Sequence, residues 1–284
     1  MNRTCLILLG GFLIAMCTGC VDLSGLLDIQ PNGSGTITLK IYNPHKNPAA
    51  IKAKKDRLKD ASLIDKVVGG LKNETEYQIA SFYDPSEEKN LKQLTTVFGP
   101  GVKLVNHRPI KREDGTPGVL AIYRFTDVNQ LRIGPQELGP GAEPGPPPWA
   151  YRFKLEKGTK QRLLVFPPSE RELRNSLSIK DSIIGIDQIP GFEGLVRRMM
   201  NYSRIKFVIK TGNRIHSSNA IYAVPGRADS LILADLEMKK VMQILGYQRM
   251  LEISNPMDLK AISGKRNKGM LLEDPKKIIL VEFQ

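Results

Sequence analysis

Residues 26–42 read LLDIQPNGSGTITLKIY, and this stretch decides how the chain begins to fold. The Asn32-Gly33 pair lies between two apolar runs, and both residues tolerate the positive φ that a tight hairpin turn requires. In the second run, apolar residues alternate with threonine and lysine, so they share one side of a strand. The apolar set is Ile37, Leu39 and Ile41. The sequence therefore predicts a β-hairpin with one buried face.

Further strands are expected along the chain, most of them joined to a neighbour by a short turn. The predicted strands cover residues 77–83, 102–110, 119–126, 149–155, 162–166, 204–210, 220–224, 231–233 and 277–283. The expected turns are Asp114-Gly115, Lys157-Gly158 and Gly212-Asn213. In residues 119–126 both sides are apolar, which predicts a central strand covered on both faces.

Helices are expected between these strands. Residues 47–71 begin with Asn47-Pro48, a capping asparagine followed by a proline at the first helical position. Lysines opposite the apolar stripe of this segment suit a solvent-facing helix surface, or else a helix lying on a membrane. Asp84-Pro85-Ser86-Glu87 has the spacing of a capping box and predicts a helix that ends at Gly99. Other helices are predicted over residues 192–201 and 236–245 and after Asn255.

These elements together predict an α+β fold, a mostly antiparallel sheet or meander with several flanking helices. Residues 134–148, GPQELGPGAEPGPPP, interrupt the pattern. Six prolines and four glycines in these fifteen residues are incompatible with a sheet or a helix. The segment is either an interdomain linker or a long loop. We favour the loop, because both sides read as parts of one meander.

The first twenty residues have the organisation of an export signal. Arg3 precedes a mostly apolar run at residues 5–16, followed by the small residues Thr18 and Gly19. This run is too short to cross a bilayer as a helix, which needs roughly 20 residues. A positive start, a compact apolar core and small residues at a cleavage site are typical of a secretory signal.

Cys17-Thr18-Gly19-Cys20 resembles the lipobox of bacterial lipoproteins, in which the last cysteine receives a diacylglycerol and becomes the first residue after cleavage. The resemblance covers residues 1–20 and implies that Cys20 is lipidated. Cys17 stands where the family usually has leucine, and cysteine is small and apolar enough for that position. The alternative is a plain secretory signal with an incidental cysteine. The predicted organisation is a lipoprotein signal peptide at residues 1–19 and a periplasmic α+β body at residues 20–284.

The cysteines and the residues after Cys20 fit an anchored protein. Cys5, Cys17 and Cys20 are the cysteines of the chain, so the mature form keeps a single thiol and has no disulfide to form. Three acyl chains on Cys20 would anchor it stably to membrane lipid, since even one chain binds marginally. No flexible tether precedes the first apolar run, so we expect the body close to the membrane. Val21 at the second mature position resembles outer-membrane sorting in enterobacterial lipoproteins, which implies the periplasmic face of the outer membrane.

The composition is that of a globular protein with a basic surface. The chain has 284 residues, 41% of them hydrophobic, and a net charge of +13; loss of Arg3 with the leader leaves 13 − 1 = +12. This charge favours anionic surroundings such as phospholipid head groups or an anionic envelope polymer, and an envelope protein is a further possible partner. An extracytoplasmic address makes nucleic acid an unlikely partner. The alternative is a solvated basic surface without a dedicated partner.

No pattern of catalytic or metal-ligating residues stands out. His45, His107 and His216 lie far apart and have no second ligand at helical spacing, so we expect no metal site. Residues 203–206 (S-x-x-K), 210–212 (K-T-G) and 217–219 (S-x-N-like) resemble signatures of penicillin-binding proteins and serine β-lactamases. In that family the serine begins a helix and long stretches separate the elements. Here all three lie within seventeen residues of strand-like sequence, so we expect no acylating serine.

The acid pairs are explained by local structure. The pairs Asp22/Asp28, Glu87/Glu88, Glu113/Asp114 and Glu273/Asp274 lie beside turns, caps or polar runs. A glycosidase needs two acids facing each other across a cleft, and spacing alone does not indicate such a pair. We therefore expect no catalytic residue and no cofactor.

The leading hypothesis is a non-catalytic binding, scaffold or assembly module of the bacterial envelope, anchored through Cys20. The first alternative is a carrier of an apolar or anionic small ligand, in a pocket lined by Trp149, Tyr151 and Phe153. The second is a cell-wall or lipid hydrolase. Beyond the leader, Gly33-Ser34-Gly35 and Ser218-Asn219-Ala220 resemble segments of uncharacterised envelope lipoproteins, which implies no particular activity.

Overall fold

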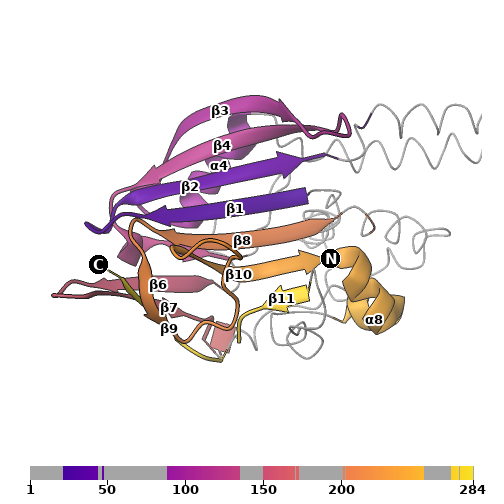
Figure 1. Ribbon diagram of the computed structural model, residues 1–284. Helices are drawn as coiled ribbons and strands as arrows, with labels where there is room; N and C mark the ends of the chain where they lie inside the picture. Colours follow the sequence, from indigo (N-terminus) through magenta and orange to yellow (C-terminus); the bar gives the residue numbers. More distant parts are fainter. Residues whose placement is uncertain are drawn as a thin grey trace, which may run out of the picture.

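The computed structural model describes residues 22–43, 47, 88–134, 150–169, 171–172, 201, 203–252, 270–274 and 276–283. Within these residues the chain forms two β-sheets around one hydrophobic core (Figure 1). The α-helices whose bounds the structure describes are α4 (Glu88–Phe98) and α8 (Met238–Leu251).

The larger sheet has seven strands in the order β11-β10-β8-β1-β2-β4-β3. Their bounds are β1 (Asp22–Ile29), β2 (Gly35–Tyr42), β3 (Lys103–Lys111), β4 (Pro117–Phe125), β8 (Arg204–Thr211), β10 (Ser230–Glu237) and β11 (Met270–Leu272). Neighbouring strands are antiparallel except for β1 and β8, which run parallel. The chain's first described strand thus lies inside the sheet, between β2 and a strand from the distant part of the chain.

The β1–β2 hairpin is confirmed, and so is its buried face: Ile37, Leu39 and Ile41 are at most 3% exposed. The turn uses five residues rather than two. Gly33 alone has a positive φ, of 91°, whereas the Asn32 side chain accepts the backbone N–H of Ser34 at 2.9 Å. Asn32 therefore acts through its side chain, as in an Asx turn.

The smaller sheet has five antiparallel strands in the order β5-β6-β7-β12-β9. Their bounds are β5 (Arg132–Ile133), β6 (Tyr151–Glu156), β7 (Gln161–Phe166), β9 (Ile215–Ser218) and β12 (Ile279–Phe283), and the 3-10 turn η2 (Val128–Gln130) precedes β5. The last described strand of the chain lies inside this sheet, between β7 and β9.

A single cluster of buried side chains joins the two sheets with α4. In Figure 1, α4 lies behind the larger sheet, against the side that carries the core. Tyr123 of β4 donates its hydroxyl to the Leu91 carbonyl of α4 at 3.0 Å, and its ring meets Phe98 edge-on with centroids 5.2 Å apart. This contact positions α4 on the side of β4 that carries Tyr123, whereas Leu120 and Ile122 on the other side of β4 are partly exposed.

The expectation of an α+β fold with several flanking helices is wrong for the described residues. Twelve strands in two sheets dominate this part of the chain, against α4 and α8 as the helices with described bounds. One physical reason is visible at residue 236, where we expected a helix to begin. Strand β10 continues to Glu237, because residues 234–237 pair with β8 beyond a bulge, and α8 starts only at Met238.

Other predictions have mixed outcomes. The strand expected over residues 220–224 is reduced to a bridge between Ala223 and Leu231. The outer side of β4 is only partly covered at Leu120 and Ile122, against the expectation of cover on both faces. Several predictions lie wholly or almost wholly outside the described residues: the helix from residue 48, the strand at 77–83, the segment at 134–148 except residue 134, the helix at 192–201 except residue 201, and the helix after Asn255.

Candidate functional site

The predicted lipidation site lies just before the fold begins. Cys17 and Cys20 are outside the described residues, and β1 starts at Asp22, two residues after Cys20. At the rise of an extended chain this separation is about 7 Å. In the described part of the chain, no helix has the length and apolar character that a bilayer-spanning helix needs.

The three motifs that resemble serine acyl-transferase signatures do not form one site. Ser203 is buried before β8, and Lys206 lies 3.7 Å from the Asp235 carboxylate. Thr211 of the K-T-G motif donates its hydroxyl within the following turn. Ser217 lies on β9 in the other sheet and donates to Glu282 at 2.7 Å. Each motif therefore serves the local structure of its own strand.

The predicted acids and histidines are also dispersed. Asp28 pairs with Lys210 at 2.9 Å, and Glu88 pairs with Lys92 on α4. His107 and His216 are exposed on strands of different sheets, while His45 and Glu87 lie outside the described residues. Among the described residues there is no group of three or more His, Cys, Asp or Glu side chains arranged to hold a metal ion.

Arg112 binds one acid at the start of β1 and another in the turn between β3 and β4. Its guanidinium donates to Asp22 at 3.0 Å and to Asp114, and it lies over the Tyr42 ring at 5.8 Å. The bond from Arg112 holds the pKa of Asp114 well below its usual range. Burial raises the pKa of Asp22 because its desolvation outweighs the attraction of Arg112.

The aromatic residues that we expected around a ligand pocket belong to the core. Tyr151 is 6% exposed and Phe153 is 3% exposed, both in β6, while Trp149 lies outside the described residues. Burial, and then the Glu273 carboxylate, raises the pKa of Tyr151. These side chains fill the space between the sheets, and the carrier hypothesis loses the pocket on which it was built.

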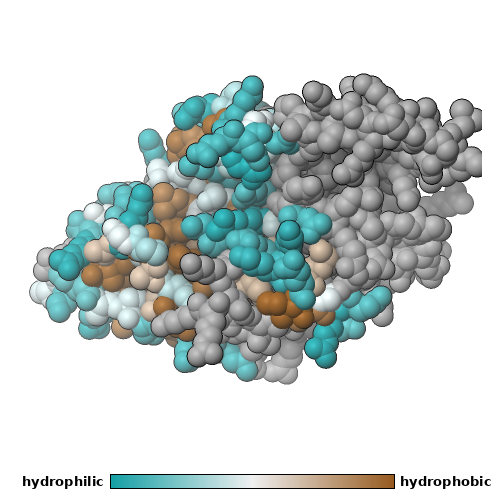
Figure 2. Space-filling model, turned by 45° about the vertical axis from the view of Figure 1, so that its right-hand side comes forward, coloured by the Kyte–Doolittle hydropathy of each residue, from teal (hydrophilic) through white to brown (hydrophobic). Residues whose placement is uncertain are grey.

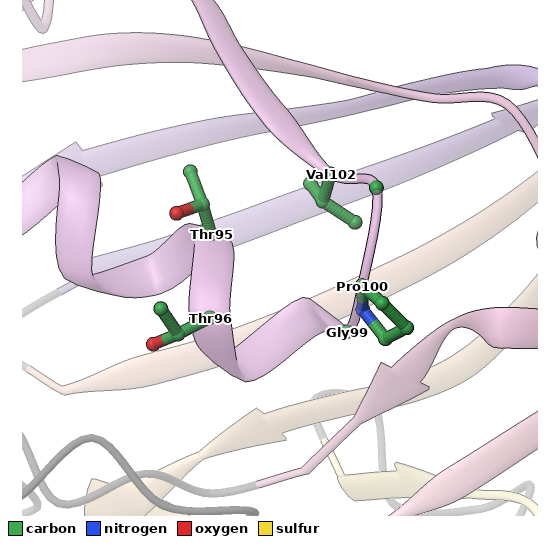
Figure 3. A pocket seen from close by; sticks show the side chains of 6 residues that line it. Thr95, Thr96, Gly99, Pro100 and Val102 are labelled. Atoms are coloured by element: carbon green, nitrogen blue, oxygen red, sulfur yellow. The ribbon is translucent and has the colours of Figure 1, made fainter.

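A shallow hollow of about 230 Å³ lies where α4 ends (Figure 3). It is lined by Thr95, Thr96, Gly99, Pro100, Gly101 and Val102. Both threonine hydroxyls already donate to carbonyls of the preceding helical turn, at 2.6 and 2.8 Å. No charged side chain lines the hollow, so it offers little to fix a polar ligand.

A group of cations without described acid partners lies on the outer side of β2, β3 and β4. The sequences of these strands, GTITLKIY, KLVNHRPIK and PGVLAIYRF, contain no aspartate or glutamate. By register, Lys40 and Arg108 flank Leu120, and Lys103 pairs directly with Arg124. Residues paired across strands point to the same side of a sheet, so these four cations share one face. We call the four cations, with Leu120 and Ile122 between them, the basic face.

The basic face differs from the rest of the same sheet. Its four cations are exposed, and none of them forms an ion pair within the described residues. On the neighbouring half, Arg204 binds Asp235 through two hydrogen bonds of 2.8 and 2.9 Å, and Lys210 binds Asp28. Charge is therefore balanced on β1, β8 and β10 and unbalanced on β2, β3 and β4.

The chemistry of the basic face suits an extended anionic surface. Adjacent strands are about 4.8 Å apart, so Lys40 and Arg108 lie roughly 10 Å apart, about one Debye length at physiological salt. This spacing is that of the two backbones, and both long side chains extend over the same face, where their positive potentials reinforce each other. Figure 2 shows hydrophilic side chains around a small apolar area on the upper part of the molecule, over these strands. The sequence analysis missed the face because its residues are spread from 40 to 124. The absence of aspartate and glutamate from all three strands was the feature of the sequence that could have indicated it.

No protein-family model matches the chain, and no curated protein matches it. Among solved structures, the chain is similar to the folded domain of the LppM protein of Mycobacterium tuberculosis, determined by NMR, at 8% sequence identity and a TM-score of 0.26. The match covers 75% of this chain and 80% of that one. With so low a TM-score, this likeness establishes neither a shared fold nor a shared function.

Proposed function

We propose that the protein is a lipoprotein of the bacterial cell envelope, anchored through acylated Cys20 and acting as a non-catalytic binding, scaffold or assembly module. The observation that carries the proposal is the lipobox-like Cys17-Thr18-Gly19-Cys20 directly before a folded strand. Under the alternative of a plain secretory signal, the cysteine at this position would be incidental.

The start of β1 supports a role at the membrane surface. Asp22 follows Cys20 by two residues, which span at most about 7 Å, so the acylated end and the larger sheet stay close together. The body is therefore held beside the bilayer rather than on a long tether. Outer-membrane sorting, as Val21 suggests, belongs to this proposal.

The basic face supports a binding role. Four exposed cations without described acid partners, on a rigid sheet, attract anionic molecules and impose a fixed spacing on them. The dispersed serines, histidines and acids are engaged in local structure or lie apart, and this arrangement is the reason for preferring a binding module over a hydrolase.

The anchor is tested by replacing Cys20 with alanine. We expect the parent protein to stay in the membrane fraction after a high-salt wash and to yield an N-terminal peptide carrying acyl chains by mass spectrometry. The C20A protein should lose the lipid and the membrane retention. Cys17→Leu is the matched control, since it removes a nearby cysteine and restores the residue common in lipoboxes. An N-terminal peptide of the parent protein without lipid would contradict the anchor.

The binding role is tested by crosslinking the tagged, lipidated protein in cells, followed by mass spectrometry. Recovery of one envelope component in defined proportion supports the binding or scaffold role and identifies the partner. Recovery of nothing specific contradicts it.

A further inference from the structure

We infer that the basic face lies against anionic head groups of the membrane that holds Cys20, so that the larger sheet lies along the bilayer. This inference rests on the proposed function for its anchor and goes beyond it in naming the surface and the partner. The partner chemistry is a phosphate-bearing lipid surface, and the contacting residues are Lys40, Lys103, Arg108 and Arg124.

Charge provides the first argument. A lysine or arginine near an anionic membrane surface strengthens binding about fivefold, provided that no neighbouring acid cancels it. The four cations meet this condition, because β2, β3 and β4 contain no acid and the described ion pairs of the sheet lie elsewhere. By contrast, Arg204 on β8 is already neutralised by Asp235.

The apolar residues among the cations provide the second argument. Leu120 and Ile122 are partly exposed in the middle of the basic face, and Val105 is 45% exposed at the β3 bulge. A surface that combines cations with apolar side chains suits the interface of a bilayer, where head groups and acyl chains meet. Cations alone would contact only the head groups, whereas these apolar side chains can also contact the acyl region.

The position of the anchor provides the third argument. Lys40 pairs with Ser24, two residues after the start of β1 at Asp22, or about 7 Å along the strand. Arg124 pairs with Thr36, whose partner in β1 is Asp28, six residues after Asp22, or about 20 Å along the strand. If the strands stood upright, the Arg124 end would lie beyond the Debye length of about 8 Å from the head groups. All four cations reach the membrane only when the strands lie along it.

The short link also decides between a membrane and a soluble polymer. A polyanionic envelope polymer would satisfy the same charges, but its local concentration depends on supply. The membrane is held within reach by Cys20, so its effective concentration at the basic face is always high. Binding of the basic face to a soluble polymer instead of the membrane would therefore contradict the inference.

The test uses the mature lipidated protein, whose one thiol is blocked by lipid, so a new cysteine is labelled uniquely. A nitroxide is placed at Thr38→Cys on the basic face or at Thr159→Cys in the β6–β7 turn. The protein is reconstituted in phosphatidylcholine vesicles with or without phosphatidylglycerol. A lipid head group carries a nickel chelate, which speeds the relaxation of a nitroxide that lies close to the membrane surface. We expect strong relaxation at position 38 in anionic vesicles, weakening as the salt concentration is raised, and weak relaxation at position 159.

Charge reversal provides the matched control. K40E with R108E changes the net charge as much as K157E with K160E, and all four side chains are exposed. The first pair should abolish relaxation at position 38, while the second pair should leave it intact. Equal effects of the two pairs, or equal relaxation at position 38 in neutral and anionic vesicles, would overturn the inference. Binding of soluble polyphosphate to the basic face, together with no relaxation at position 38 in anionic vesicles, would overturn it in favour of a polymer.

A second measurement distinguishes failure of the anchor from failure of the basic face. If Cys20 carries no lipid, the proposed function fails, and the mature C20A chain, which retains every described strand, is sedimented with the same vesicles. K40E with R108E should then weaken binding to anionic vesicles at least about 25-fold, at about fivefold per charge. An unchanged affinity would refute the basic face as a membrane surface independently of the anchor.

Discussion

At the scale of single residues, Glu273 shows how much a local reading of the sequence misses. Next to Asp274 in a polar run, it suggested an acid placed for a turn. In the structure its side chain is 2% exposed and accepts the backbone N–H groups of Ile221 and Tyr222 at 2.7 and 2.8 Å. These amides lie about fifty residues away, so no window of sequence could have paired them. The carboxylate ties the end of β11 to the segment before β10.

Glu273→Ala should therefore lower the free energy of unfolding by about 2 kcal/mol, because two enclosed amides lose their acceptor. Glu273→Gln keeps one oxygen acceptor and should lose less. Urea denaturation measures both. The exposed Glu113→Ala is the control and should stay within about 0.5 kcal/mol of the parent. A loss of equal size at Glu113 would contradict the assignment.

Asp22 provides a pH-dependent test at the same scale. Because burial raises its pKa above the ordinary 3.8, the native state holds this proton more tightly than the unfolded chain. Its contribution to stability is present below the unfolded pKa and is lost as the pH rises through the native pKa. The advantage of Asp22→Asn over the parent should therefore grow from about pH 3 to about pH 6 in urea titrations. An advantage that shrinks over this range would mean that the ion pair with Arg112 dominates.

At the scale of elements, strand β3 is the exposed edge of the larger sheet. Among the described strands it has β4 on one side and no partner on the other, and seven of its nine residues are exposed. Such an edge invites pairing with another chain unless the sequence opposes it. A bulge at Val105, the proline at 109 and the charge of Lys111 oppose it here.

Replacing Pro109 and Lys111 together with valine should increase association without a large loss of stability. The edge would gain an N–H donor and lose a charge that keeps other chains away. Light scattering at matched protein concentrations should show more association than for the parent. Valine at Lys157 and Lys160, in the β6–β7 turn, removes two charges away from an edge. If that control associates equally, hydrophobicity rather than edge pairing is responsible.

Elements that depend on neighbouring residues were predictable, and those that depend on distant ones were not. The β1–β2 hairpin and the two strands on either side of Asp114-Gly115 follow from turn chemistry and alternation within a few residues. The start of α8 was misplaced because pairing of β10 with β8 extends the strand to Glu237. The basic face needs the registers of three strands, which no local pattern contains.

At the scale of the whole molecule, both sheets and α4 share one core, so they should unfold together. Phe283, fully buried in β12 of the smaller sheet, gives the test. Phe283→Ala should cost about 4 kcal/mol, and hydrogen exchange should accelerate equally in peptides from β2 and from β7. Acceleration confined to β7 would contradict a common cooperative unit. The partly exposed Phe166→Ala is the milder comparison in the same sheet.

The parallel pairing of β1 with β8 has a consequence for the order of assembly. Asp28 of β1 meets Lys210 of β8 across 182 positions of the chain, and β12 enters the smaller sheet last. As the chain emerges from its amino end, β1 and β2 appear early, yet the other side of β1 stays open until β8 arrives. Folding of a topology with such distant contacts is slow, and until β8 pairs with it the free edge of β1 can pair with the wrong strand or with another copy of the chain. An end fastened to a membrane before β8 appears would keep that strand apart from other copies during the wait.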